Sequence, residues 1–63
     1  MTVLEMKEQR NSVIKQMESL NAAAKKEERK LNEDEEKKFA ALESQKRGLD
    51  TAIETIEYWK AQQ

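Results

Sequence analysis

Arg29-Lys30-Leu31-Asn32-Glu33-Asp34-Glu35-Glu36 is the stretch that decides the fold. It interrupts an apolar pattern that recurs every three or four residues on both sides of it. Asn32 followed by Glu35 fits a capping box, in which the asparagine side chain accepts from a backbone N–H and the glutamate reaches back. The acidic run also places negative charge at the positive end of a helix dipole. We therefore predict a turn at about residues 29–32 and a helix at about residues 33–62.

A second helix is predicted upstream of the turn. Thr2 and Glu5 repeat the capping pattern, so this helix should span about residues 3–28. Because a short connection reverses the chain, the fold class is all-α, an antiparallel two-helix coiled-coil hairpin. The helix–helix interface is predicted to comprise Val3, Met6, Val13, Met17, Leu20, Phe39, Leu42, Leu49, Ile53 and Ile56.

One polar residue interrupts the apolar pattern, or stripe, of each predicted helix. Arg10 and Lys46 stand at interface positions. Either their aliphatic stems lie along the interface while the charged heads reach water or a nearby carboxylate, or they fix the pairing register. Gly48 lies on the outer side of the second helix, where it marks either a bend or close helix crossing, or a neutral surface position.

A layer of only two helices is thin. About a dozen large apolar side chains, at ~2 kcal/mol each when fully buried, must offset the conformational entropy of the whole chain. Ile14, Ala52 and Trp59 lie beside the main interface and widen the apolar face. We predict that they form an oligomer contact through which hairpins associate into a helical bundle. For Trp59, packing at the bundle edge is the alternative to anchoring a partner.

Composition excludes several functional classes. Among 63 residues, 12 Lys or Arg and 13 Asp or Glu alternate along the chain, so we expect no continuous basic face for nucleic acid. The absence of Cys and His removes disulfides, thiolate metal sites and the commonest general base. The run Glu33 to Glu36 diverges around a helix and is explained better as a solvated first turn than as a metal site. We predict no catalytic, metal-binding or cofactor-binding residue and no cofactor.

The chain has no segment that predicts a membrane or secreted location. No apolar run approaches the ~20 residues that cross a bilayer, and no signal-peptide pattern follows Met1, so a cytosolic setting is expected. Residues 60–63 contain no Gly, Asn or Pro to end the second helix. The chain is therefore expected to be a fragment of a longer protein.

Nearly the whole sequence resembles one known family. Leu31-Asn32-Glu33-Asp34-Glu35-Glu36, followed by Phe39, Leu42, Leu49 and Ile53 and closing on Ile56-Glu57, looks like the N-terminal region of tailed-phage major capsid proteins of the Hong Kong 97 type. The Met-Thr-x-Leu-Glu start and a charged first helix with Arg10 and Ile14 fit the same region. In that family the region is called the delta or scaffolding domain.

The resemblance implies a non-enzymatic scaffolding segment that promotes capsid subunit assembly through coiled-coil contacts. It further implies that the partners are other capsid subunits and, as in many members of the family, a maturation protease that removes the segment. The implied location is the procapsid, in the cytoplasm of a bacterial host. Two other hypotheses remain from the residues themselves: a free-standing hairpin that acts as an interaction or adaptor module for a partner helix, and a coiled-coil arm of a larger enzyme.

Overall fold

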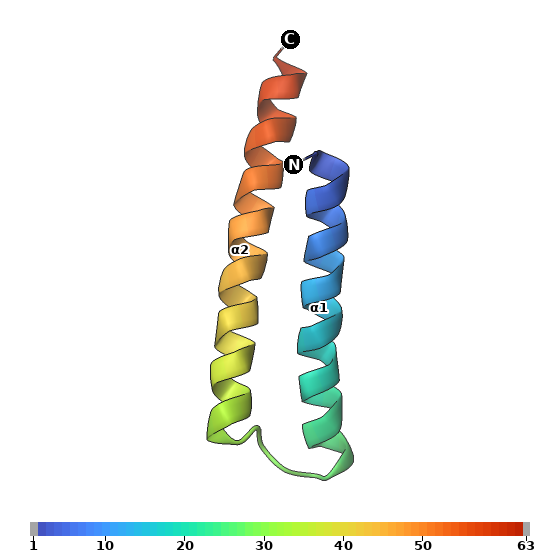
Figure 1. Cartoon of the computed structure of the whole chain (residues 1–63), viewed down its shortest axis with the longest axis vertical. Coiled ribbons are helices and arrows are strands. Elements are labelled where there is room, and N and C mark those ends of the chain that lie inside the picture. Colours follow the sequence, from blue (N-terminus) through green and yellow to red (C-terminus); the bar gives the residue numbers. More distant parts are fainter. Residues whose placement is uncertain (1, 63) are drawn as a thin grey trace.

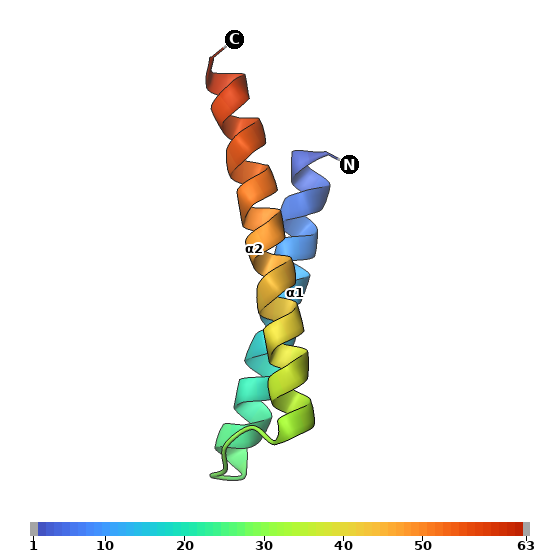
Figure 2. The ribbon, with the colours of Figure 1, turned by 90° about the vertical axis from the view of Figure 1, so that its left-hand side faces the viewer.

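Two antiparallel α-helices form the structure, a computed structural model that describes residues 2–62 (Figure 1). Helix α1 spans Val3–Lys26 and helix α2 spans Glu33–Ala61. The predicted all-α hairpin is therefore confirmed. The molecule is a rod of 50 × 16 × 16 Å, and its helices cross at a shallow angle (Figure 2). Met1 and Gln63, the ends of the predicted hairpin, lie outside the described residues.

Both helices begin at the predicted capping boxes. The backbone N–H of Glu5 donates to Thr2 Oγ1 at 3.1 Å, and the Thr2 N–H donates to Glu5 Oε1 at 3.4 Å. At α2, the Glu35 N–H donates to Asn32 Oδ1 at 2.8 Å, and the Asn32 N–H donates to Glu35 Oε1 at 3.0 Å. These side chains pair backbone N–H groups that have no partner within the helix, which explains why each helix starts where it does.

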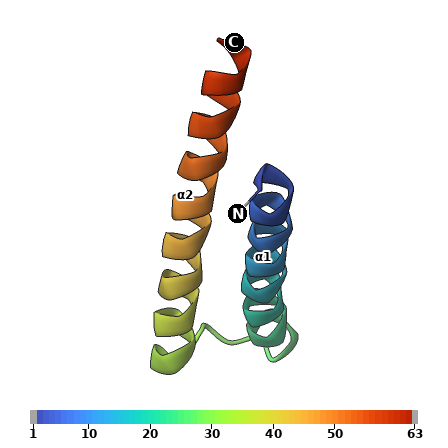
Figure 3. The same cartoon turned by 45° about the horizontal axis from the view of Figure 1, so that its top comes forward.

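Helix α1 ends earlier than predicted, at Lys26 and not at about residue 28. Glu28 has a φ of 53°, in the left-handed region, and so cannot continue the helix. The Arg29 N–H donates to the Ala24 carbonyl at 3.0 Å and the Glu28 N–H donates to the Lys25 carbonyl at 3.1 Å. This crossed pair of hydrogen bonds is a Schellman motif. The turn therefore covers residues 27–32. Helix α2 is longer than α1, and its C-terminal end at Ala61 extends past the N-terminal end of α1 (Figure 3).

The core of this hairpin is small. Only Val13, Ala24 and Ile53 are buried among the described residues, with 7%, 5% and 8% of their surface exposed. The accessible surface is 5166 Å², compared with roughly 4,200 Å² for a compact folded protein of this mass. The radius of gyration is 14.8 Å, whereas a compact chain of this length has about 11 Å. Each helix thus covers one side of its neighbour and leaves the other sides open.

Candidate interaction surfaces

The predicted interface residues define a line along each helix that we call the seam, and they are buried to unequal depth. Val13 on α1 and Ile53 on α2 are buried. The other eight are partly exposed, namely Val3, Met6, Met17, Leu20, Phe39, Leu42, Leu49 and Ile56. Leu20 and Leu42 line one groove between the helices, and Val13 and Leu49 line another. At these levels the structure brings residues of both stripes together.

An ion-pair cluster occupies the seam where Arg10 and Lys46 interrupt it. Arg10 Nε donates to Asp50 Oδ1 across the two helices, and Lys46 Nζ donates to Asp50 Oδ2 at 2.8 Å. The Asp50 side chain is 28% exposed, so the cluster is partly shielded from water. Lys46, and then Arg10, hold the pKa of Asp50 below its usual value. Both charged heads therefore reach a carboxylate, which was one of the two interpretations of these residues.

The apolar periodicity does not predict that Asp50 takes part in this cluster. The sequence feature that could have indicated it is the position of Asp50 four residues after Lys46, a spacing at which oppositely charged side chains meet on one helix face. Its contact with Arg10 joins residues forty positions apart and depends on how the two helices pair. Asp50 is thus the residue that turns two isolated cations into one cluster.

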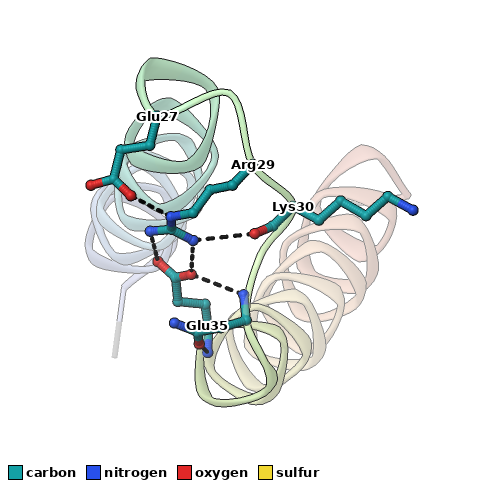
Figure 4. Close-up of polar contacts among 5 residues, drawn as sticks. Glu27, Arg29, Lys30 and Glu35 are labelled. Carbon is teal, nitrogen blue, oxygen red and sulfur yellow. Dashed lines mark hydrogen bonds and ion pairs between the residues drawn. The ribbon is translucent and has the colours of Figure 1, made fainter.

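A second cluster fastens the two ends of the turn together (Figure 4). Arg29 Nη1 and Nη2 donate to the two carboxylate oxygens of Glu35 at 2.5 and 3.2 Å, and Arg29 Nε donates to Glu27. Arg29 Nη1 also donates to the Lys30 carbonyl at 3.2 Å. The Arg29 guanidinium, helped by the Asn32 N–H, lowers the pKa of Glu35 to about 2. Since Glu35 also caps α2, one carboxylate connects the end of α1 to the first turn of α2.

One side of the seam carries an almost uncharged groove, which we call the neutral groove. Its first part has a volume of about 450 Å³, and its second part, which shares Gln16 with the first, has about 490 Å³. Leu20, Leu42, Val13 and Leu49 lie at the seam within it. The remaining lining residues, from both helices, are Gln9, Ser12, Gln16, Ser19, Lys38, Ala41, Gln45 and Gly48. Lys38 is the one charged residue in this lining.

The other side of the seam is highly charged. A groove of about 380 Å³ there is lined by Lys7, Arg10, Asn11, Asp50, Ile53 and Glu54. Lys7 and Gln9 mark the two sides of α1, because residues two apart point roughly 200° apart around a helix. Lys7 Nζ lies 2.8 Å from Glu57 Oε1, and this ion pair lowers the pKa of Glu57. Cations of α1 are therefore paired with carboxylates of α2 on this side.

The three residues predicted to form an oligomer contact do not share one side. Ile14 follows Lys7 by seven residues, or about two turns, and so lies on the charged side. Ala52 follows Gly48 by four residues and Trp59 follows Ala52 by seven, which places both on the side of the neutral groove. Trp59 is 61% exposed, and its ring meets the Tyr58 ring edge-on at 5.4 Å between centroids. The structure thus brings Ala52 and Trp59 onto one surface and leaves Ile14 on another.

Gly48 opens onto free space. A Cβ placed on it would meet no atom within 4 Å beyond its chain neighbours and the adjacent backbone of its own helix. Its φ is not positive, and α2 continues through it from Glu33 to Ala61. Neither a turn nor a close contact inside the hairpin therefore requires a glycine at this position.

The described residues offer no cluster for metal chemistry and no bilayer span. Within residues 2–62, no three His, Cys, Asp or Glu side chains gather so that they could hold a metal ion. Neither α1 nor α2 has an apolar stretch long enough to cross a membrane.

No protein-family model matches the chain, and no curated protein or solved structure matches it. Its function is therefore inferred from the residue pattern and from the geometry of its helix faces.

Proposed function

We propose that the hairpin is a protein–protein assembly element that acts as the scaffolding segment of a phage capsid subunit. The observation that carries the proposal is the open seam. Leu20, Phe39, Leu42 and most other seam residues are partly exposed, although they are large apolar side chains. Such partly covered apolar surface is stabilised when a neighbouring helix covers it.

The specific role rests on the sequence resemblance described above, and the geometry suits it. A rod with a tight turn can project from a larger subunit, and many tethered copies raise one another's effective concentration. Each contact between hairpins can then be weak and still favour assembly. Weak contacts also allow the segment to be released afterwards.

Two experiments test the scaffolding role, and the first is to read the coding sequence after Gln63. A capsid domain that follows directly supports the proposal, and a stop codon contradicts it. The second changes Phe39 and Leu42 to Asn in the full-length subunit and counts procapsids by electron microscopy. We expect procapsids to be lost or misshapen, because polar residues at these positions weaken the seam. Ala40→Ser, at an exposed position between them, should preserve the yield. Normal particles from the Asn variant would contradict the proposal.

A free-standing interaction module is the second candidate. The exposed Tyr58 and Trp59 at the end of α2 favour it, because exposed aromatic residues are typical anchors for a partner. A stop codon directly after Gln63, together with loss of partner binding in Trp59→Ala, would select this function over scaffolding.

A further inference from the structure

We infer that the neutral groove is the surface on which a second copy of this hairpin docks, giving a four-helix dimer. The inference rests on the proposed assembly function and refines it by naming the contact surface. Four observations support it: the distribution of charge, the chemistry of the lining, the amount of exposed surface and the position of Gly48.

Charge is distributed unevenly between the two sides of the seam. Charged residues make up 40% of the chain, yet Lys38 is the only one in the lining of the neutral groove. On the other side, Lys7 pairs with Glu57 and Arg10 pairs with Asp50. Burying paired charges against another molecule costs desolvation energy, whereas amides and hydroxyls cost less to bury. The neutral side is therefore the favourable side for contact.

The lining of the neutral groove is complementary to itself. In a dimer with two-fold symmetry the same surface faces its own copy, so a face of like charges would repel. Gln and Ser side chains each donate and accept hydrogen bonds, and Gln9, Gln16 and Gln45 can therefore pair with the same residue types on the partner. These properties favour a second copy of the chain over a charged partner.

The excess of exposed surface on the hairpin is similar in size to the surface that a standard interface buries on each partner. The hairpin exposes 5166 Å², which exceeds by roughly 1,000 Å² the surface of a compact protein of its mass. A standard protein–protein interface buries about 800 Å² on each partner. One contact of that size along the neutral groove would cover most of this excess surface on each hairpin.

Gly48 is the position at which we place the two-fold axis of the dimer. It lies near the middle of α2 and faces open space, so a two-fold axis there lets the two α2 helices approach closely. Ala41 and Thr55, seven residues to either side, would then face each other across the dimer. Trp59, eleven residues beyond Gly48, would lie near Lys37 of the second copy, eleven residues before it. The dimer would thus cover Trp59, which is exposed in the hairpin.

Sedimentation of the 63-residue chain over a range of concentrations tests the inference, with the emission of Trp59, the only tryptophan, as a second readout. We expect a monomer–dimer equilibrium in which Trp59 emission moves to shorter wavelength as dimer forms. Gln45→Lys places like charges near the two-fold axis and should weaken the dimer at least about tenfold. Ala40→Lys adds the same charge at an exposed position that points about 140° away from Gln45, and should leave the dimer intact.

Gly48→Ala separates an effect on the dimer from an effect on the stability of the helix. Alanine favours the helix, so the helicity of dilute monomer should rise, while the added Cβ should weaken the dimer. A chain that stays monomeric at every concentration would overturn the inference, as would equal dimerisation by Gln45→Lys and Ala40→Lys. These outcomes are separate from the scaffolding role, which is decided by the sequence after Gln63 and by particle yield.

Discussion

The Arg10 guanidinium on α1 donates a hydrogen bond to the Asp50 carboxylate on α2, forty residues further along the chain. Both side chains lie at the seam, and Lys46 occupies the other oxygen of the same carboxylate. Sliding one helix by a single layer would move these groups about 5 Å apart, beyond hydrogen-bond reach. The cluster therefore favours one pairing register over its neighbours, as polar residues at a coiled-coil interface can.

The first prediction concerns this cluster. Asp50→Asn should lower the melting temperature more than Glu54→Gln, because it leaves Arg10 and Lys46 as neighbouring cations without a carboxylate. In an Arg10→Gln background the same Asp50→Asn change should cost less, since one cation is already gone. Thermal unfolding followed by circular dichroism completes this double-mutant cycle. Additive effects would show that Arg10 and Asp50 do not interact.

The second prediction concerns the depth of the core. Ile53→Ala should destabilise the hairpin by about 2–5 kcal/mol, because it leaves a gap at one of the few buried positions. Leu4→Ala removes a side chain that is 67% exposed and should change stability by less than about 0.5 kcal/mol. Chemical denaturation measures both changes. Similar losses for the two variants would argue against a core centred on Ile53.

The third prediction uses the left-handed conformation of Glu28. Glu28→Gly should stabilise the hairpin by about 1 kcal/mol, because glycine adopts a positive φ without steric cost. For a domain of this size, that corresponds to a rise in melting temperature of about 4–8 °C. Lys26→Gly, inside the last turn of α1, should instead destabilise by about 1 kcal/mol. A lower melting temperature for Glu28→Gly would contradict the turn described here.

The fourth prediction concerns acid unfolding. The pKa of Glu35 is about 2 in the folded hairpin and 4.5 for an unperturbed glutamate. Because folding lowers the pKa, the contribution of the Arg29–Glu35 pair is fully present above pH 4.5 and is lost as the pH falls from there towards 2. Glu35→Gln should therefore lower the melting temperature at pH 7 and have much less effect near pH 2. A gap between the two melting curves that stays constant with pH would rule out this linkage.

Local sequence patterns predict where the two helices start. They do not predict where α1 ends or which side chains meet between the helices. Thr2 and Asn32 start the helices because their side chains satisfy nearby backbone groups, which depends only on sequence neighbours. The early end of α1 depends on a left-handed Glu28, and no Gly or Asn announces it. The role of Asp50 and the separation of Ile14 from Ala52 depend on the pairing of two helices, which apolar spacing alone does not specify.

The turn at one end of the rod also sets the order in which the hairpin can form. Arg29 and Glu35 are six residues apart, Arg10 and Asp50 are forty apart, and Lys7 and Glu57 are farther apart still. The entropy lost on closing a loop grows with its length, so contacts near the turn form at the lowest cost and bring the next pair within reach. We therefore expect the hairpin to form from residues 27–32 towards its two termini and to open first at the opposite end.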